Sequence, residues 1–418
     1  MAGEQGTGRA FADIMRLAEL VEPGQPGWTR RVFSPEYRSS RALVAELMGG
    51  AGLTVTQDAA GNLIGKLPSD RPEAPALVLG SHTDTVLGGG RFDGMAGVAA
   101  AIEVARRLRE RGQPLTRPLW VVDFLGEEPN AFGISCVGSR AVAGALTREH
   151  LGLEGPDGRT LADALSEHGA DPERIVEARW ASGVVGSYLE LHVEQGPRLE
   201  RAGLGLGVVT AIAGIHRAEI RLVGRADHAG TTPMGQRRDA LLAAAEVCLA
   251  LEAIGSRDEL GVATVGHLVL EPNSANVVAE LVTLVAEYRS SDPNWLTESD
   301  RQLVEMISEG PSRRGVQGAI SWLSQEPPTA CSEHLMRLLT RAVGQLGEEP
   351  LALPSGAGHD AVQIASLCPV GMLFIPSRDG RSHCPEEWTE PDQVELGVRA
   401  LEVAALELLS GGPKGEGA

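Results

Sequence analysis

The sequence predicts an α/β protein, with a mostly parallel sheet that carries helices on both faces and an inserted smaller α+β domain. Its 418 residues exceed the size at which one hydrophobic core usually stops growing, so two domains are expected. Apolar strands alternate with helical stretches over residues 1–211 and 328–418, an order typical of a parallel sheet. Between them, residues 212–327 follow a strand–helix–strand–strand–helix order that suits an α+β domain.

The chain begins with two predicted helices and a pair of strands. Apolar residues recur at helical spacing over residues 10–22, and a second helix is expected over 35–48. The turn at 58–61 separates two short predicted strands, 53–56 and 62–65.

The next two predicted strands are apolar runs that end in polar side chains. Residues 76–79 lead to His82, and strand 118–125 leads to the acidic pair Glu127–Glu128, with an Ala-rich helix over 97–111 between them. In open α/β sheets the chemistry lies at the carboxyl ends of the strands. We therefore expect these polar groups to share one site.

The remaining elements complete the two predicted domains. A strand over 186–193 carries His192. The other predicted elements are helical segments within 141–180, strands 218–224, 261–270, 277–289 and 371–375, and helices 238–254, 292–308, 332–346 and 391–409.

Composition and charge exclude several classes of protein. The net charge of −19 argues against nucleic acid or an anionic membrane as a partner, because both require basic patches. The five cysteines form no CxxC pair, so reduced thiols are expected and a thiolate zinc site is not. Residues 1–9 lack the apolar stretch of a signal peptide, and no apolar run is long enough to span a bilayer, so a cytoplasmic protein is expected.

A metal site is the hypothesis that best explains the polar residues at the ends of these elements. Divalent ions of borderline softness accept both carboxylate and imidazole ligands. A single histidine such as His192 is more often a packed or solvent-facing residue, so the argument is collective. Asp84 lies two residues after His82 and, in extended chain, points the same way, so it could orient the ring. The candidate ligands and acids are His82, Asp93, Glu127, Glu128, His192 and His383.

The adjacent carboxylates Glu127 and Glu128 repel each other unless a cation or a shared proton lies between them. Because consecutive side chains diverge, one can bind a metal while the other faces a substrate water. The alternative is a solvated acidic turn, which the preceding buried strand and Pro129 disfavour.

A series of motifs resembles the amidohydrolases that cleave N-carbamoyl groups: N-carbamoyl-L-amino-acid hydrolases, allantoate amidohydrolases and β-ureidopropionases, within the aminoacylase/carboxypeptidase superfamily of two-metal hydrolases. They occur in the family's order over nearly the whole chain. The motifs are Gly80–Val86, Arg91–Gly94, Glu127–Glu128, Phe132–Gly133, Gly138–Arg140, Leu191–Pro197, Asp227–Met234, Pro272–Val277, Ser355–Ala361 and Ser382–His383.

The resemblance implies two divalent metal ions per subunit, which could be zinc, manganese, cobalt or nickel, and hydrolysis of a linear amide by a metal-bridged water. It assigns the residues as follows: Asp93 bridges the metals, His82 and His192 complete one site, Glu128 and His383 complete the other, Glu127 is the general base, and Asp84 orients His82.

The resemblance also implies substrate contacts. His228 would stabilise the oxyanion, Asn276 and Arg289 would hold the substrate carboxylate, and Gln195 would contact the ureido group. The backbone from Gly356 to Gly358 could approach the ligand closely. The inserted domain would close over the substrate as a lid and form a homodimer, with some groups reaching a neighbouring active site. Simpler alternatives are a surface role for Arg289 and a turn role for His228.

Some positions depart from the family pattern. Pro129–Phe132 stands where Gly-Ser-Arg-Phe is common, Glu287 stands at a usual Asp position, and His216 stands where an aromatic residue is frequent. None removes a ligand, but the first leaves the exact substrate open, and the sequence shows no obvious aromatic cluster for a bulky side chain. An aminoacylase or dipeptidase remains an alternative. A catalytically inactive binding protein is the third hypothesis, although it should have lost Glu127 or a ligand.

Overall fold

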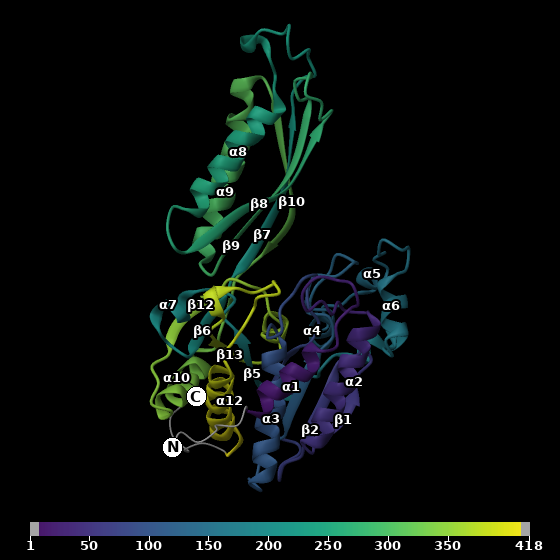
Figure 1. Cartoon of the computed structure of the whole chain (residues 1–418), viewed down its shortest axis with the longest axis vertical. Coiled ribbons are helices and arrows are strands. Elements are labelled where there is room, and N and C mark those ends of the chain that lie inside the picture. The colour runs from purple at the N-terminus through teal and green to yellow at the C-terminus, as the bar shows by residue number, and fades with distance from the viewer. Residues whose placement is uncertain (1–7, 411–418) are drawn as a thin grey trace. The chain divides into compact units, whose positions relative to one another are not determined.

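The computed structural model describes residues 8–410 (Figure 1). The N-terminal segment 1–9, for which no signal peptide is expected, lies mostly outside the described residues. The chain divides into two units: a large unit that ends at Thr210 and resumes over Cys331–Leu353 and from Gly358, and an inserted unit formed by Ala211–Ala330 with Pro354–Ala357.

The large unit is built on a nine-stranded mixed sheet. Its strand order is β1-β2-β4-β3-β5-β13-β6-β11, and β12 pairs with β6. The central pairs β4–β3, β3–β5 and β5–β13 are parallel, whereas the pairs toward both edges are antiparallel. The strands are β1 (Thr54–Gln57), β2 (Leu63–Leu67), β3 (Ala76–His82), β4 (Leu119–Phe124), β5 (Val185–Val193), β6 (Gly207–Ile212), β11 (Thr329–Ala330), β12 (Leu351–Ser355) and β13 (Val370–Ile375).

Helices flank this sheet and close its core. Figure 1 shows α1, α3 and α12 side by side, and their apolar faces join those of α2 and α10 in one cluster with the central strands. Leu77 and Leu79 on β3 are fully buried there, which stabilises the fold by roughly 1.5–3 kcal/mol per side chain. The helices of the large unit are α1 (Arg9–Ala18), α2 (Pro35–Gly50), α3 (Met95–Glu110), α4 (Val137–Ala143), α5 (Arg148–Leu151), α6 (Leu161–Glu167), α7 (Arg198–Ala202), α10 (Glu333–Gln345), α11 (Asp360–Ile364) and α12 (Pro391–Leu409).

The inserted unit is a four-stranded antiparallel sheet with two helices and its own core. Its strand order is β10-β7-β9-β8, so β8 and β10 are the edge strands. Asp239 and Asp292 cap the two helices by accepting hydrogen bonds from backbone N–H groups of the first turn. The elements are β7 (Gly214–Val223), α8 (Ala240–Gly255), β8 (Gly261–Glu271), β9 (Leu281–Ser290), α9 (Pro293–Glu309) and β10 (Gln317–Glu326).

The predicted fold class is confirmed, with some elements added. Strands β6, β10, β11 and β12 were not predicted. In β10, Gly318, Ser321 and Ser324 interrupt the apolar alternation, and the strand forms because β7 supplies its hydrogen-bonding partner. The five cysteines are free, as expected. Within residues 8–410, no helix has both the length and the apolar character needed to cross a bilayer.

Candidate active site

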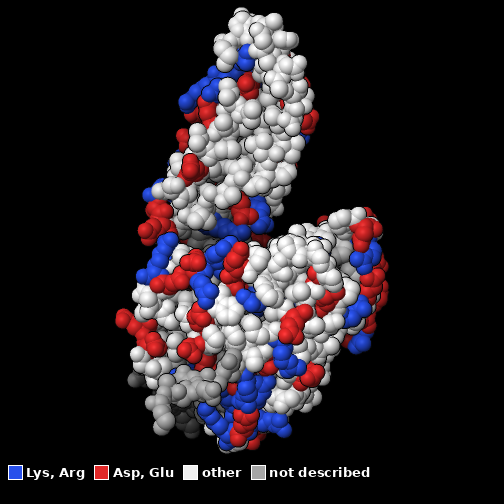
Figure 2. Space-filling model, in the orientation of Figure 1, with Lys and Arg blue, Asp and Glu red and all other residues white. Residues whose placement is uncertain are grey.

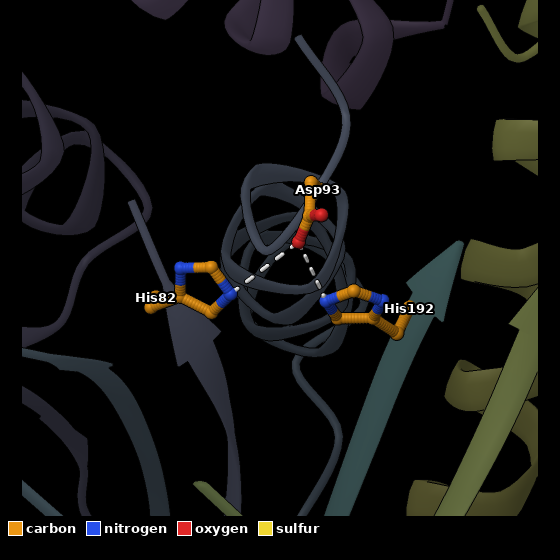
Figure 3. A group of neighbouring side chains, drawn as sticks. All are labelled: His82, Asp93 and His192. Carbon is orange, nitrogen blue, oxygen red and sulfur yellow. Dashed lines mark ion pairs between the residues drawn. The ribbon is translucent and has the colours of Figure 1, made fainter. Parts of the chain in front are cut away.

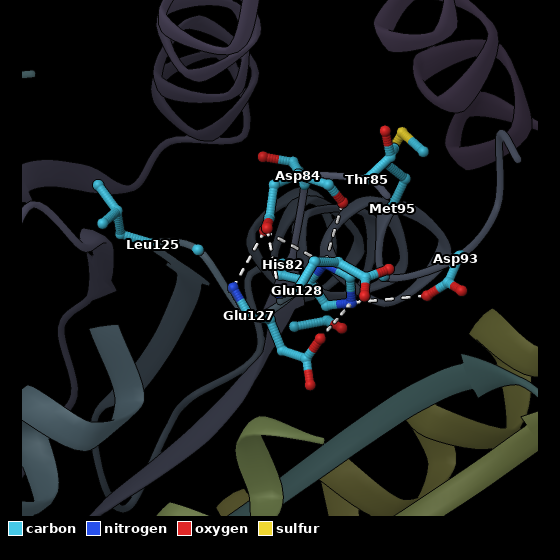
Figure 4. A network of polar contacts seen from close by, with 12 residues as sticks. His82, Asp84, Thr85, Asp93, Met95, Leu125, Glu127 and Glu128 are labelled. Atoms are coloured by element: carbon cyan, nitrogen blue, oxygen red, sulfur yellow. Dashed lines mark hydrogen bonds and ion pairs between the residues drawn. The ribbon is translucent and has the colours of Figure 1, made fainter. Parts of the chain in front are cut away.

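The strand order of the large sheet brings the predicted ligands together. His82 ends β3, Glu127–Glu128 follows β4, and His192 lies near the end of β5. Asp93 precedes α3, and His383 lies in the segment after β13. Because β4, β3, β5 and β13 are neighbouring parallel strands, their carboxyl ends share one edge of the sheet. Figure 4 shows His82, Asp93 and both glutamates converging there.

The carboxylate of Asp93 lies between two groups of possible ligands. Its Oδ1 is 3.6 Å from Nε2 of His82 and 3.2 Å from Nε2 of His192 (Figure 3). Its Oδ2 is 3.0 Å from Nε2 of His383, and that nitrogen is 3.3 Å from Oε1 of Glu128. Each oxygen of this carboxylate therefore faces a different set of possible ligand atoms.

These side chains form two compact groups whose nitrogen and oxygen atoms are suited to bind divalent ions. In each group, His82–Asp93–His192 and Asp93–Glu128–His383, one ligand atom per residue lies within 4.8 Å of the others. Imidazole nitrogen and carboxylate oxygen are the ligand types that zinc and similar ions prefer. A third such group contains Glu190, His192 and His359, and it shares His192 with the first.

The hydrogen bonds of the His82 and His192 rings orient their Nε2 atoms toward the site. Nδ1 of His82 contacts the carbonyl oxygen of Asp84 at 3.2 Å, and Nδ1 of His192 contacts that of Val193 at 2.9 Å. The backbone N–H of Gly94 donates to Nε2 of His192 at 3.1 Å. A ring that donates through Nδ1 keeps a lone pair on Nε2, so both rings are oriented as metal ligands. The residues present therefore fit a pair of divalent ions.

Asp84 joins the two strand ends that carry these groups. Its Oδ1 accepts from the backbone N–H of Glu127 and its Oδ2 from that of Glu128, each at 3.1 Å (Figure 4). The same Oδ1 is 3.4 Å from Nδ1 of His82. One fully buried carboxylate thus fixes the glutamate turn and the His82 ring together.

The clustered charges shift the ionisation of the site. For Asp93, burial alone would raise the pKa, but hydrogen bonds from the three histidines outweigh it and hold the pKa well below its usual range. Burial and then the charge of Asp93 raise the pKa of Glu128 to about 8. The hydrogen bond to Asp93 raises the pKa of His383 to about 9. A divalent cation would favour ionised carboxylates and neutral imidazoles, because it replaces the protons that otherwise offset these charges.

Glu127 lies beside the first group. Its Oε2 is 3.7 Å from Nε2 of His82, and its Oε1 is 3.6 Å from Sγ of Cys136. Burial is the main cause that raises the pKa of this carboxyl well above its usual value. A carboxylate with a raised pKa is a stronger base, so Glu127 is suited to accept a proton from a water. Nothing in the sequence pattern indicates the contact between Glu127 and Cys136.

Gln195 contacts the carboxylate of Asp93. Its Nε2 donates to Oδ2 of Asp93 at 2.7 Å and lies 3.3 Å from Nε2 of His383. Its Oε1 is buried and has no hydrogen-bond partner among residues 8–410. That oxygen is available to accept an N–H from a ligand.

The remaining predicted contacts lie in the inserted unit or at its boundary. His228 pairs with Val277 in an isolated bridge, and the carbonyl of Asn276 accepts from the N–H of Ala229 at 3.0 Å. Asn276 and Val277 precede the first residue of β9, Leu281. Arg289 is the residue before the last of that strand. Leu281 and Arg289 are eight residue steps apart on β9, or about 26 Å along the strand. Within one inserted unit, Arg289 therefore does not meet His228 or Asn276.

Arg289 is held by partners within the inserted unit. Its Nε donates to Oε1 of Glu287 at 2.7 Å, and one terminal nitrogen donates to the carbonyl of Gly356 at 3.1 Å. Glu287, one of the departures from the family pattern, thus positions the guanidinium. A Cβ at Gly356 or Gly358 would meet no atom within 4 Å, so the chain itself does not require glycine there.

A cavity of about 590 Å³ lies beside Glu128 in the large unit. Val32, Phe33 and Phe132 form its apolar wall, and the rings of the two phenylalanines are 5.8 Å apart in an edge contact. The sequence did not reveal this aromatic pair, because its members lie far apart in the chain. The segment Pro129–Phe132, which differs from the family pattern, also lines the cavity.

Comparison with known proteins places this geometry in a family. The model of peptidase family M20/M25/M40 matches residues 78–407. The chain is 39% identical over 403 residues to an N-carbamoyl-L-amino acid amidohydrolase of Geobacillus stearothermophilus, covering 96% of this chain and 98% of that protein. It is 32% identical over 388 residues to an allantoate amidohydrolase of Bacillus subtilis (strain 168), covering 92% and 93%.

The fold has matching solved structures. An amidase of the hydantoinase/carbamoylase family from Burkholderia multivorans superposes with a TM-score of 0.88 at 32% identity, covering 97% of this chain and 98% of that chain. The resemblance seen in the motifs is confirmed, and the chain belongs to peptidase family M20/M25/M40, a family of metal-dependent hydrolases.

Proposed function

We propose that this protein hydrolyses the linear amide bond of N-carbamoyl-L-amino acids or of related ureido acids such as allantoate. The observation that carries the proposal is the Asp93 carboxylate, with one oxygen facing His82 and His192 and the other facing His383. The relatives named for ureido substrates span nearly the whole chain. They favour this function over that of an aminoacylase or dipeptidase.

Two divalent ions would be held by His82, Asp93 and His192 and by Asp93, Glu128 and His383, and when bound they would acidify a water and polarise the scissile carbonyl. Glu127 takes a proton from the attacking water and returns it to the leaving nitrogen. Oε1 of Gln195, which lacks a partner in residues 8–410, accepts from an N–H of the ureido group. Asp84 keeps His82 and the glutamate turn in place. The reaction releases the free amino compound and carbamate, which decomposes to carbon dioxide and ammonia.

A substrate panel tests this function. Protein reconstituted with zinc, manganese, cobalt or nickel should release ammonia from N-carbamoyl-L-amino acids or allantoate, and a chelator should abolish the reaction. The panel should include N-acetyl amino acids and dipeptides. Turnover of those compounds alone would assign the chain to the aminoacylase or dipeptidase alternative.

We further propose a homodimer formed through the inserted unit. The edge strand β8 has no charged residue before Glu271, and its Val262, Leu268 and Val269 are exposed. A long uncharged edge strand of this kind readily pairs with another strand. Leu241, Leu242 and Leu249 of the adjacent α8 are also exposed, and much of the visible face of this unit in Figure 2 lacks charged side chains. A second copy of β8 and α8 would cover this apolar surface.

In a dimer, groups at both ends of β9 could contact an active site. Because Arg289 lies about 26 Å along β9 from Leu281, at the end of the strand opposite to His228 and Asn276, we propose that His228 and Asn276 act on the active site of the partner.

Mixed dimers test this arrangement directly. His228→Ala and Glu127→Gln should each be nearly inactive, whereas refolding or co-expressing them together should restore activity to about a quarter of the wild-type sites. Half of the dimers are mixed, and each mixed dimer has one site with both wild-type groups. If His228 acts within its own subunit, mixing restores nothing. Leu249→Arg in both chains should produce monomers by light scattering and prevent the recovery.

Arg289→Ala should mainly raise KM for substrates that carry a carboxylate. Loss of a charged hydrogen bond is expected to lower kcat/KM by roughly 10–100-fold. Arg217→Ala is the matched control, because Arg217 also pairs with Glu287 from the neighbouring strand. A substrate with an amide in place of the carboxylate should show no difference between Arg289→Ala and wild type. An equal loss with both substrates would contradict carboxylate binding by Arg289.

A further inference from the structure

A buried carboxylate links the two loops that carry Asp93 and His383. Glu387 is fully buried, and its Oε1 accepts from the backbone N–H of Phe92 at 2.7 Å and of Asp93 at 3.1 Å. Its Oε2 accepts from Oγ of Ser382 at 2.5 Å. The same hydroxyl lies 3.0 Å from Oδ2 of Asp93. Glu387 therefore contacts the backbone on one side of the site and the residue before His383 on the other.

Gly90 permits this close approach. A Cβ at Gly90 would lie 2.1 Å from Oε1 of Glu387, well inside van der Waals contact. The φ angle of Gly90 lies outside the left-handed region, so the backbone conformation does not require glycine. What an alanine would displace here is the Glu387 side chain.

A second set of contacts joins the same two loops. The guanidinium of Arg91 lies 4.3 Å from the ring centre of Trp28 and 4.6 Å from that of Trp388. Nε1 of Trp28 donates to the carbonyl of Pro385 at 3.1 Å. The segments before Asp93 and after His383 are thus packed together independently of Glu387.

No Lys or Arg in residues 8–410 forms an ion pair with Glu387 within 4 Å, whereas Asp93 lies close by. A buried carboxylate without a cationic partner is retained only where hydrogen bonds satisfy it. Here those hydrogen bonds come from the backbone and from Ser382, so the side chain orders the loops that surround it.

We propose that Glu387 is a positioning residue that sets the spacing between Asp93 and His383, and hence the affinity of the second ion group, Asp93–Glu128–His383; the proposal rests on the two-metal function above. That group takes one ligand from each of the two loops. The other members of the first group, His82 and His192, lie on strands β3 and β5, whereas the hydrogen bonds of the Glu387 side chain within residues 8–410 go to Phe92, Asp93 and Ser382. Loss of Glu387 should therefore weaken the second ion far more than the first.

Zinc titration without substrate tests the proposal. Wild-type protein should bind two zinc ions, measured by chelator competition and by elemental analysis after dialysis. Glu387→Ala should keep one ion and bind the second about 10–100-fold more weakly, as is typical when a residue that orients a ligand is lost. Glu387→Gln should keep both, because its carbonyl still accepts from Phe92 and Asp93 and its amide can donate to Ser382.

Two further variants make the result decisive. Glu402→Ala removes another buried carboxylate, which pairs with Arg107 and Arg111, and should still bind two ions. Gly90→Ala displaces Glu387 without removing it and should reproduce the loss of the second ion, even if Glu387→Ala fails to fold. Wild-type zinc affinity in Glu387→Ala or Gly90→Ala would overturn the proposal, as would equal losses in Glu387→Gln and Glu387→Ala. Because no substrate is present, these outcomes are independent of whether ureido acids are hydrolysed.

Discussion

Glu127→Gln is expected to lower kcat by about 10²–10⁴-fold while leaving metal binding intact. The amide has nearly the shape of the carboxylate but cannot take a proton from water. The backbone N–H of Glu127 would still donate to Asp84, so the turn that holds Glu128 should persist.

The measurement pairs kinetics with metal analysis on the same sample. Glu127→Gln should contain as much metal as the wild type, whereas Glu128→Gln should bind less and also lose activity. This contrast separates the two adjacent acids, which the sequence could distinguish only by resemblance. Turnover within about threefold of wild type in Glu127→Gln would remove Glu127 as the general base.

Asp93→Asn is expected to abolish binding of both ions and with it the activity. The amide offers one weak oxygen ligand, whereas the carboxylate presents Oδ1 to His82 and His192 and Oδ2 to His383. Replacing a direct ligand should weaken zinc binding by more than the ~10–100-fold typical of a residue that only orients a ligand. Activity should fall in parallel.

Thermal unfolding gives a readout that does not depend on substrate. Zinc should raise the Tm of wild-type protein, because a ligand that binds only the native state stabilises it by mass action. The same addition should leave the Tm of Asp93→Asn unchanged. Comparing each protein with and without zinc cancels any effect of the substitution itself on stability. A wild-type zinc-dependent rise in Asp93→Asn would contradict the bridging role.

The meeting of the candidate ligands could be predicted because the fold imposes a simple rule. His82 and His192 lie at or near the ends of apolar strands, Glu127–Glu128 directly follows another, and parallel strands deliver their carboxyl ends to one edge. His383 lies in a loop without periodicity. It was a candidate because it is a polar residue in a loop after an apolar strand, and only the resemblance grouped it with Glu128. The pattern of residues alone therefore located most of the centre.

Contacts between distant loops could not be predicted in this way. Glu387 is four residues from His383, but nothing in the local sequence indicates that its carboxylate accepts from Asp93. The contact between Phe33 and Phe132 could not be predicted for the same reason. Such contacts depend on the paths of loops that are distant in sequence, and hydrophobic periodicity does not determine those paths. The separation of Arg289 from Asn276 likewise became apparent only from the register of β9.

The position of β13 bears on how the protein matures. This strand lies between β5 and β6 in the large sheet, yet it is formed by Val370–Ile375, near the end of the chain. During synthesis the inserted unit, which has its own core, is complete before β13 has been made. The large sheet closes only after β13 has been made, and closing it requires pairings of β13 with β5 and β6, which are remote in sequence and form slowly. The group Asp93–Glu128–His383, whose last member follows β13, therefore assembles after the inserted unit has been made.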